Sequence, residues 1–478
     1  MFLADAGPFV EAPKWVNAGD TAWQLTAATF VGLQSIPGLA ILYGGLVKKK
    51  WALNSAVMVF YAFSAVLMVW ILWGYNIAFG ASAPGILTNW VGIPGPALGP
   101  AAETGQAVIP LATGGMPPLH FPGAAMIYFQ FVFAAITPIL IAGSVFGRMN
   151  FKAWMIFVPV WSSIVYSVGA FWIWGGGWLA QLGAVDYSGG YVIHLAAGVS
   201  GFVAAAVVGP RLVEDRKDFE PNNLIMAFAG AGILWLGWNG FNGGDPYFAS
   251  ADAGGAVINT NLATACAMMT WIFMDLFLSS EKKATFLGGV NGMICGLVGI
   301  TPAAGYVNGL GAIAIGVIDS AIVWVAWAYL PKYVWPFKKV DDALGVVYTH
   351  GIAGLFGGLM VGLFADPKMI EYIGLGKISS ISGAGLFYGH PHQLLVQFEA
   401  ALTIIVWDAL VTFLLLKGIG LFMNLRLPEA DLEIGDVAVH GEEAYPSDEL
   451  ISVGASSRAD EVSAVDGKVA VTAPQDDS

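Results

Sequence analysis

The segments DYSGGYVIHLAAG (residues 186–198) and DALGVVYTHGIAG (residues 342–354) share one pattern, in which a histidine follows an aspartate by eight residues and a glycine follows the histidine by four. Each copy opens a long stretch that is almost free of charge. If these stretches are helices, eight residues advance the chain by about 12 Å, from a membrane surface towards the middle of the bilayer. The repeat therefore predicts that His194 and His350 meet at mid-membrane depth.

The composition is that of a membrane protein. Of the 478 residues, 57% are hydrophobic and 11% are charged, and the mean hydropathy is +0.70. Soluble proteins carry roughly 25% charged residues, so an ordinary soluble enzyme is excluded. The formal charge of −13 also argues against the basic surface that a nucleic-acid partner needs. Cys266 and Cys295 lie in apolar stretches without the spacing of metal ligands, so we expect no disulfide, metal site or cofactor.

A bilayer requires about 20 mainly apolar residues per crossing helix. The sequence contains eleven such segments, at residues 21–47, 52–79, 123–146, 153–174, 188–208, 224–241, 256–278, 285–300, 309–330, 344–364 and 394–423. We therefore predict an all-α polytopic membrane protein with eleven transmembrane helices. Its domains would be an extracytoplasmic segment (residues 1–20), a transmembrane domain (residues 21–423) and an acidic cytoplasmic tail (residues 424–478).

Positive charges between these segments predict the orientation, because Lys and Arg accumulate on cytoplasmic loops. They follow every second segment, as Lys48, Lys49, Lys50, Arg148, Lys152, Arg211, Arg216, Lys217, Lys282, Lys283, Lys332, Lys338 and Lys339. The other side has only Lys14, Lys368 and Lys377. The N-terminus is thus predicted outside and the C-terminus inside. The two histidine motifs then enter from opposite faces, which predicts two inverted five-helix repeats plus one extra helix.

The paired histidines favour a functional interpretation over a packing one. One histidine inside a membrane helix is more often a satisfied packing residue, but two that are related by a repeat indicate a pathway, since ionisable groups in lipid are costly. The aspartates differ from them. Asp186 and Asp342 stand at helix starts, where a carboxylate accepts hydrogen bonds from free N–H groups, so a capping role is favoured over substrate contact.

Aromatic residues cluster near the predicted outer ends of several segments. They are Phe133, Trp174, Trp238 and Phe241. Each alone is typical of an interfacial belt or a core. Asp245 follows Phe241 by four residues at the same end, so together they suggest a cation site made of π faces and an acceptor.

Several motifs in order resemble the Amt/Mep/Rh family of ammonium transporters, over residues 18–445. They are IPGLAILYGGLV (36–47), FQFVF (129–133), WGGG (174–177), GWNGFNG (237–243), DDALGVVYTHG (341–351), LRLPE (425–429) and HGEEAY (440–445), together with the first histidine motif. Trp174 favours the Amt branch, because Rh members usually lack that tryptophan.

The resemblance implies a homotrimer in the cell membrane, with one pore in each protomer. Phe133 and Trp174 would recruit the ammonium ion, and Phe133 and Phe241 would form the gate. Asp245 is added to the recruitment site from its position at the same end of the chain segment, not from the resemblance. His194 and His350 would line the pore lumen and relay a proton. Pore-lining support would come from three further residues, Gln130, Trp238 and Asp186.

Two positions depart from the family pattern. Asp245 stands where better-known bacterial members have a serine, and its charge could strengthen cation capture. Gly345 stands where some members have a further aspartate, which casts doubt on any role assigned to that inner carboxylate.

The function implied is transport, not enzymatic catalysis. Ammonium would be captured outside and deprotonated, and ammonia would cross an apolar pore. Whether the proton follows separately is left open. The alternative is an ammonium sensor or transceptor with little transport. Only 33 residues follow Tyr445, in a polar and acidic stretch that is too short for a fused kinase or cyclase. A haem held by the two histidines is a more distant alternative.

Two further implications concern the cytoplasmic face. The resemblance implies a PII-type signal protein as a partner there. Residues 427–478 contain thirteen acidic residues against Arg458 and Lys468, so the negative charge of the chain belongs mainly to the tail and a regulatory role is expected.

Overall fold

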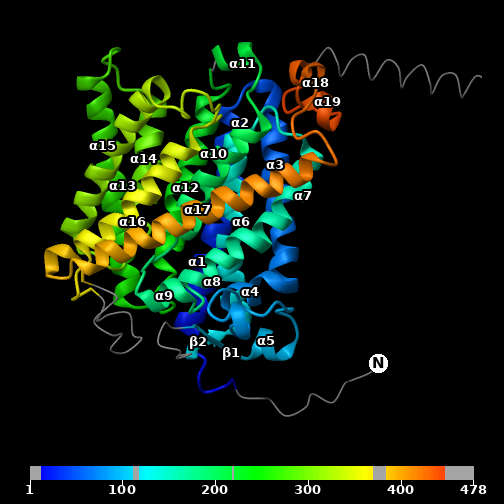
Figure 1. Ribbon diagram of the computed structural model, residues 1–478. Helices are drawn as coiled ribbons and strands as arrows, with labels where there is room; N and C mark the ends of the chain where they lie inside the picture. Colours follow the sequence, from blue (N-terminus) through cyan, green and yellow to red (C-terminus); the bar gives the residue numbers. More distant parts are fainter. Residues whose placement is uncertain (1–11, 111–117, 218–219, 370–383, 447–478) are drawn as a thin grey trace, which may run out of the picture.

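The computed structural model describes residues 12–110, 118–217, 220–369 and 384–446, which form a bundle of helices with one small sheet (Figure 1). The α-helices are α1 (Ala18–Leu33), α2 (Leu39–Leu46), α3 (Ala52–Val69), α4 (Tyr75–Phe79), α5 (Pro100–Thr104), α6 (Gly123–Val145), α7 (Phe151–Trp161), α8 (Ser167–Ile173), α9 (Trp178–Leu182), α10 (Ala196–Val208), α11 (Val213–Lys217), α12 (Leu224–Gly243), α13 (Ala251–Leu278), α14 (Phe286–Ile300), α15 (Gly309–Tyr333), α16 (Ala353–Phe364), α17 (His392–Gly420), α18 (Glu429–Ile434) and α19 (Asp436–His440). The strands β1 (Gln106–Val108) and β2 (Pro118–Pro122) pair antiparallel.

Ten helices in the described residues are long and apolar enough to cross a membrane. They span Ala18–Leu46, Lys49–Phe79, Gly123–Val145, Phe151–Leu182, Gly190–Val208, Leu224–Gly243, Ala251–Leu278, Gly309–Tyr333, Val347–Phe364 and His392–Gly420. Each lies at one of the predicted segments. The remaining segment, residues 285–300, coincides with α14, an apolar helix of 15 residues. The all-α polytopic membrane fold is confirmed, while the count of eleven crossings and the orientation stay predictions.

A small sheet was not part of the predicted all-helical fold. β1 and β2 lie in the long loop before α6, where Gln106 pairs with Pro122. This loop lies beyond the ends of the membrane helices, so its backbone is free to form a hairpin that lipid-facing backbone could not form. The described ends of the two predicted terminal domains are short, because residues 1–11 and 447–478 lie outside the described residues.

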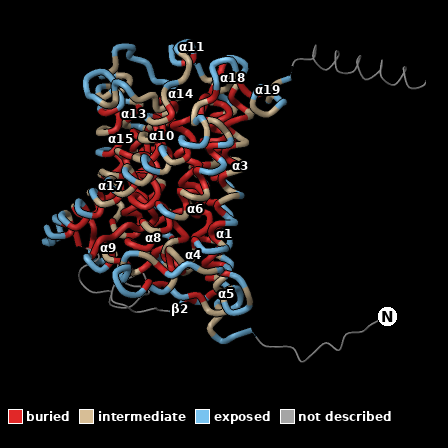
Figure 2. The backbone as a smooth tube through the Cα atoms, turned by 45° about the vertical axis from the view of Figure 1, so that its right-hand side comes forward, coloured by how far each residue is buried: buried red, intermediate tan, exposed pale blue. Residues whose placement is uncertain are grey.

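The helices are apolar on all sides, so their position in the bundle decides which residues are buried. α6 occupies the centre, and 89% of its most apolar 18-residue stretch is buried. α17 instead runs obliquely across the outside of the bundle (Figure 1). Only 28% of its most apolar 18-residue stretch is buried. Buried residues form the interior, and exposed residues gather at the two ends and along the outer helices (Figure 2). This distribution suits a protein whose flanks face lipid.

The two histidine motifs each form a π-helical turn before an α-helix. These turns are Gly190–Leu195, which leads into α10, and Val347–Ile352, which leads into α16. A π-helical turn accommodates an extra residue in the helix, and such turns are frequent at functional sites. The turns place His194 and His350 at the joints between irregular and regular helix.

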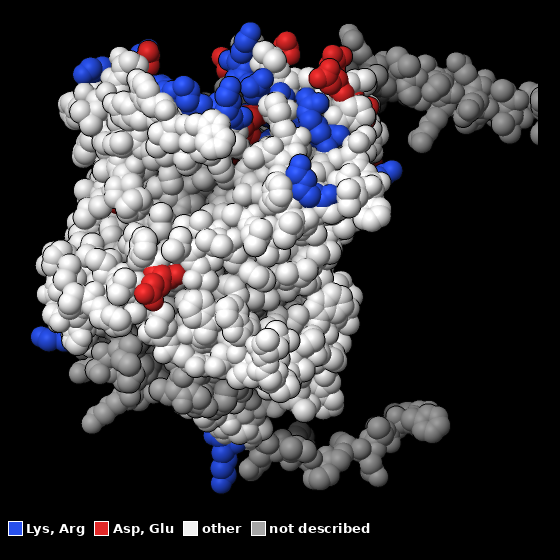
Figure 3. Space-filling model, in the orientation of Figure 1, with Lys and Arg blue, Asp and Glu red and all other residues white. Residues whose placement is uncertain are grey.

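Lys and Arg gather at one end of the molecule, near α11 and α18, which we call the basic end (Figure 3). The opposite end, which carries β1, β2 and α5, we call the strand end (Figure 1). The surface between the two ends is nearly free of charge in this view (Figure 3). Such a belt is expected where lipid tails surround the protein.

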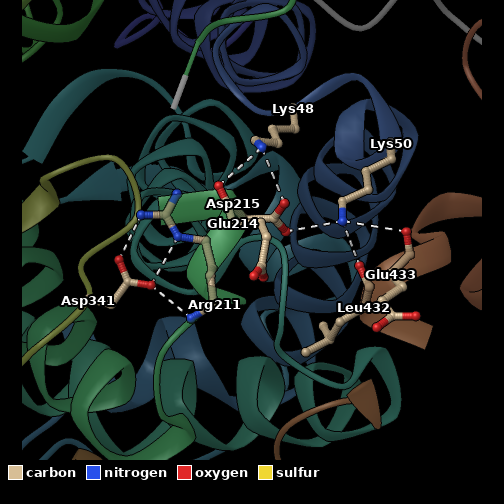
Figure 4. A network of polar contacts seen from close by, with 8 residues as sticks. All are labelled: Lys48, Lys50, Arg211, Glu214, Asp215, Asp341, Leu432 and Glu433. Atoms are coloured by element: carbon tan, nitrogen blue, oxygen red, sulfur yellow. Dashed lines mark hydrogen bonds and ion pairs between the residues drawn. The ribbon is translucent and has the colours of Figure 1, made fainter. Parts of the chain in front are cut away.

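The segment of residues 429–440 docks on the basic end through polar contacts (Figure 4). Lys50 donates a hydrogen bond to the Leu432 carbonyl oxygen at 2.8 Å and lies 3.2 Å from the Asp215 carboxylate. The Asp436 carboxylate accepts hydrogen bonds from the backbone N–H groups of Leu53 and Asn54, each at 2.8 Å, and so caps the start of α3. The beginning of the tail is therefore part of the folded protein.

Candidate functional site

His194 and His350 face one another inside the bundle. Their Nδ1 atoms are 3.4 Å apart and their rings are inclined by 26°, with centroids at 5.4 Å. The exposed fractions are 0% and 5%. One imidazole must donate and the other accept for this contact to be a hydrogen bond, so the pair suits two neutral rings that share one bridging proton.

The final glycine of each motif allows the histidines to approach. A methyl group on Gly198 would lie 2.2 Å from the Cα atom of Gly351, and one on Gly354 would lie 2.5 Å from the Gly190 carbonyl oxygen. These contacts are reciprocal, because each glycine packs against the backbone of the other motif. Small residues allow membrane helices to pack at such short distances.

Aromatic rings continue from the histidines towards the strand end. Trp238 and Phe241 stack beside His194, with ring centroids at 5.3 and 5.8 Å. Phe241 then lies 4.4 Å from Phe133, and Phe133 meets Trp174 edge to face at 6.5 Å. The two phenylalanines are fully buried, whereas Trp174 is partly exposed. The rings therefore form one continuous column between the strand end and the paired histidines.

Asp186 caps the first motif. Its carboxylate accepts hydrogen bonds from the backbone N–H groups of Gly189, Gly190, Tyr191 and Val192 at 2.6 to 3.1 Å. Because these four donors occupy both carboxylate oxygens, the carboxylate holds the helix start. The Asp186 backbone carbonyl oxygen in turn accepts a hydrogen bond from the Trp174 indole at 2.6 Å, which fixes the ring that begins the column.

Asp245 lies at the strand end of the column and is partly exposed. It accepts a hydrogen bond from the Ser188 hydroxyl, and Ser188 belongs to the first histidine motif. Burial raises the pKa of Asp245 well above its ordinary value, while the bond from Ser188 lowers it and the charge of Asp186 raises it. Nearby, the Gln130 amide donates to the Tyr247 hydroxyl oxygen at 3.0 Å. The loop that follows α12 is thus bonded to Gln130 through Tyr247 and to the first histidine motif through Asp245.

A cavity of about 340 Å³ lies on the other side of the histidines, towards the basic end. Its walls include Trp327, Asp341, Gly345 and Tyr348. At its rim Arg211 forms an ion pair with Asp341 at 2.7 Å (Figure 4). Burial alone would raise the pKa of Asp341, but the Arg211 guanidinium lowers it below the ordinary value.

Gly345 has a structural reason to be glycine. Its φ angle is +70°, and a methyl group there would lie 2.1 Å from the Trp327 ring. A larger residue would be strained at this positive φ and would have to displace the indole. Gly345 therefore forms a tight turn at the start of the second motif.

The family model described as Ammonium Transporter Family matches residues 22–445. The chain belongs to this family. It is accordingly a multi-pass membrane protein of a transporter family, not an enzyme. The interpretation of the sequence as a member of this family is confirmed.

Curated relatives support the same assignment for this ammonium transporter. It is 51% identical over 437 residues to Ammonium transporter 2 of Arabidopsis thaliana, which covers 91% of this chain and 90% of that protein. It is 49% identical over 451 residues to Ammonium transporter 3 member 1 of Oryza sativa subsp. japonica, which covers 91% and 88%. The crystal structure of Saccharomyces cerevisiae Mep2 matches with a TM-score of 0.77 at 31% identity, over 88% of this chain and 92% of that one.

The structure adds residues that sequence reasoning about this ammonium transporter missed. Ser188 contacts Asp245, Tyr247 receives the Gln130 amide, and Thr301 accepts a hydrogen bond from the Trp238 indole at 2.9 Å. Each partner is 57 to 117 positions away in sequence. Ser188 had one available signal, its place inside the histidine motif.

Proposed function

We propose that the protein captures the ammonium ion at the strand end, transfers one of its protons there to water or to the Asp245 carboxylate, and conducts ammonia past the paired histidines to the basic end. What supports this is the single column of side chains from Trp174 through Phe133 and Phe241 to His194 and His350. A column that is aromatic at one end and carries two imidazoles in a buried centre suits a cation that becomes neutral on the way.

The recruitment step is assigned to Trp174, Phe133 and Asp245. Aromatic faces attract cations by about 0.5–2 kcal/mol, more where water is excluded. In its ionised form, Asp245 adds a negative charge at the same end. Its bond from Ser188 uses one oxygen, so the other remains available to accept a hydrogen bond from an ammonium N–H.

The gate is assigned to Phe133 and Phe241, whose rings lie 4.4 Å apart and close the column. An ion that crosses this contact must lose its water, and the rings offer few hydrogen-bond acceptors in return. Ammonia has no net charge, so it crosses the same contact at a far lower cost. Potassium cannot give up a proton, and selectivity follows from that difference.

The lumen is assigned to His194 and His350, with Gln130, Trp238 and Asp186 as supporting residues. Each imidazole has one donor and one acceptor nitrogen, so the pair can take up a proton at one end and release it at the other. Trp238 stacks on His194, and its indole is held by Thr301. Asp186 fixes the helix start from which His194 projects.

We place the strand end outside the cell and the basic end in the cytoplasm, with residues 1–20 outside, residues 21–423 in the cell membrane and residues 424–478 inside. The charge distribution at the basic end supports this orientation. A homotrimer with one pore per protomer and a PII-type signal protein at the basic end are further proposals. The cavity rimmed by Arg211 and Asp341 is the surface to which we assign that partner.

The deciding experiment is uptake by proteoliposomes that contain the purified full chain. We expect an inward ammonium gradient to drive accumulation of total internal ammonium (ammonia plus ammonium ion) well above the rate of empty liposomes, whether or not the proton crosses with it. A protein that binds ammonium but leaves the internal ammonium content at the level of empty liposomes would instead act as a sensor, and the transport proposal would be wrong.

Asp245→Asn should weaken ammonium capture. The change keeps the hydrogen-bonding shape but removes the charge, so we expect the half-saturating ammonium concentration to rise about fivefold to tenfold, as for the loss of a partly buried charge contact of about 1–1.4 kcal/mol. The raised pKa of Asp245 also predicts the direction of the pH dependence: acidification protonates the carboxylate and should weaken ammonium capture by the wild type. The Asn variant should lack that part of the pH dependence.

The measurement is transport rate against ammonium concentration at several external pH values. Asp366→Asn serves as a control, since that carboxylate is bonded to Asn308 away from the column. Equal half-saturation in wild type and Asp245→Asn would remove Asp245 from the site.

A further inference from the structure

A groove of about 440 Å³ lies at the basic end, on the flank of the bundle and outside the column. The ends of α10 and α17 form its apolar wall, and the chain that follows α17 forms the other. Its lining includes two cations, Lys417 and Arg426, and the polar Asn424. It is therefore a mixed groove, apolar along the helices and positive at its mouth.

The turn beside the groove exposes large apolar side chains. Leu421 and Phe422 are 82% and 87% exposed, directly after the last residue of α17. Such residues at the end of a membrane helix lie at the level where lipid headgroups meet the acyl chains. They stand between Lys417 and Arg426 in sequence, so cations flank an apolar pair that is suited to insertion into a leaflet.

In the described part of the chain, few carboxylates lie near Lys417 and Arg426 to balance their positive charges. The Lys417 ammonium lies 5.6 Å from the centre of the Phe413 ring. Arg426 donates from Nε to the Pro210 carbonyl oxygen at 3.0 Å, which positions its guanidinium. One of its terminal nitrogens lies 3.9 Å from the Glu429 carboxylate, whose side chain is 77% exposed and contributes little in water.

We propose that this groove binds an anionic phospholipid, with the headgroup phosphate between Lys417 and Arg426 and an acyl chain along Val207 and Leu416. Phosphate accepts charge-assisted hydrogen bonds from guanidinium and ammonium groups. Basic grooves between membrane helices are suited to such headgroups, and each cation contributes about a fivefold gain in affinity. The apolar wall can pack against an acyl chain, which a soluble phosphate lacks, so the occupant is a lipid.

The site also touches the start of the tail. The Leu425 carbonyl oxygen accepts a hydrogen bond from the Asn150 backbone, and Leu427 donates one to the Arg148 carbonyl oxygen. A lipid at Arg426 would thus stabilise the chain that leads from α17 to α18.

Lipid binding to the purified full chain in detergent tests the proposal, measured by native mass spectrometry with phosphatidylglycerol and phosphatidylcholine as probes. We expect phosphatidylglycerol to bind at least tenfold more tightly. Lys417→Gln and Arg426→Gln should each weaken it about fivefold and leave phosphatidylcholine unchanged. Arg426→Lys, which keeps the charge, should retain most of the affinity. Lys283→Gln is the matched control, because this exposed lysine follows α13, away from the groove.

Three outcomes would overturn the proposal. Equal affinity for the two lipids would show that the groove does not select the anionic headgroup. An effect of Lys283→Gln as large as that of Lys417→Gln would mean a diffuse surface attraction. Displacement of the lipid by millimolar glycerol phosphate would mean a site for soluble phosphate. None of these outcomes depends on transport, so the proposed function is tested separately.

Discussion

Replacing either His194 or His350 with Ala is expected to abolish the ammonium-dependent current of proteoliposomes on a supported membrane. The two rings contact each other through Nδ1 atoms 3.4 Å apart, so each substitution breaks the relay for a proton at the same point. General acid and base groups typically contribute about 100-fold or more to a rate. We therefore expect transport to fall to the level of empty liposomes in both single variants, with little further loss in the double variant.

Histidine variants need controls for folding and for surface effects. His390→Ala changes an exposed histidine outside the column and should leave the current unchanged. Each variant should elute at the same size as the wild type, since an imidazole replaced by a methyl group removes contacts without adding any. Full current in both His194→Ala and His350→Ala would exclude the proposed relay. Loss in one alone would mean that the imidazoles act singly.

Much of the fold follows from local sequence signals. Apolar segments of membrane-crossing length are long and strongly marked, so their positions agree with the helices of the structure. The histidine motif was visible because its three elements have fixed spacing. Its glycine could be noted but not explained, since the contact of Gly198 with Gly351 joins residues 153 positions apart.

The site was only partly predictable for the same reason. The order of the rings in the column depends on how α6, α8 and α12 pack. The sequence of a helix that is apolar on all sides does not indicate which face turns inward. The π-helical turns at Gly190–Leu195 and Val347–Ile352 leave no distinctive residue pattern. The bond from Ser188 to Asp245 and the docking of Asp436 on α3 join segments that meet only after the bundle has assembled.

Gly354→Ala and Gly198→Ala are expected to destabilise the protein more than alanine at the histidines or at glycines in the outer helices. At Gly354 the added methyl group would lie 2.5 Å from the Gly190 carbonyl oxygen and 2.9 Å from the Leu195 nitrogen. Both neighbours are backbone atoms in the opposite motif, so no side-chain rotation relieves the overlap. Overpacking of this kind costs about 3 kcal/mol. We expect a lower midpoint of thermal unfolding, a lower yield of folded protein and loss of transport.

The glycines in outer helices provide the matched control. Gly418 in α17 and Gly232 in α12 have no atom within 4 Å of an added methyl group, so alanine should be tolerated at both positions. If Gly354→Ala unfolds at the same temperature as Gly418→Ala, the two motifs do not pack as closely as described. If it stays folded but loses transport, the close contact serves chiefly to hold His194 against His350, and the glycine belongs to the function as much as to the fold.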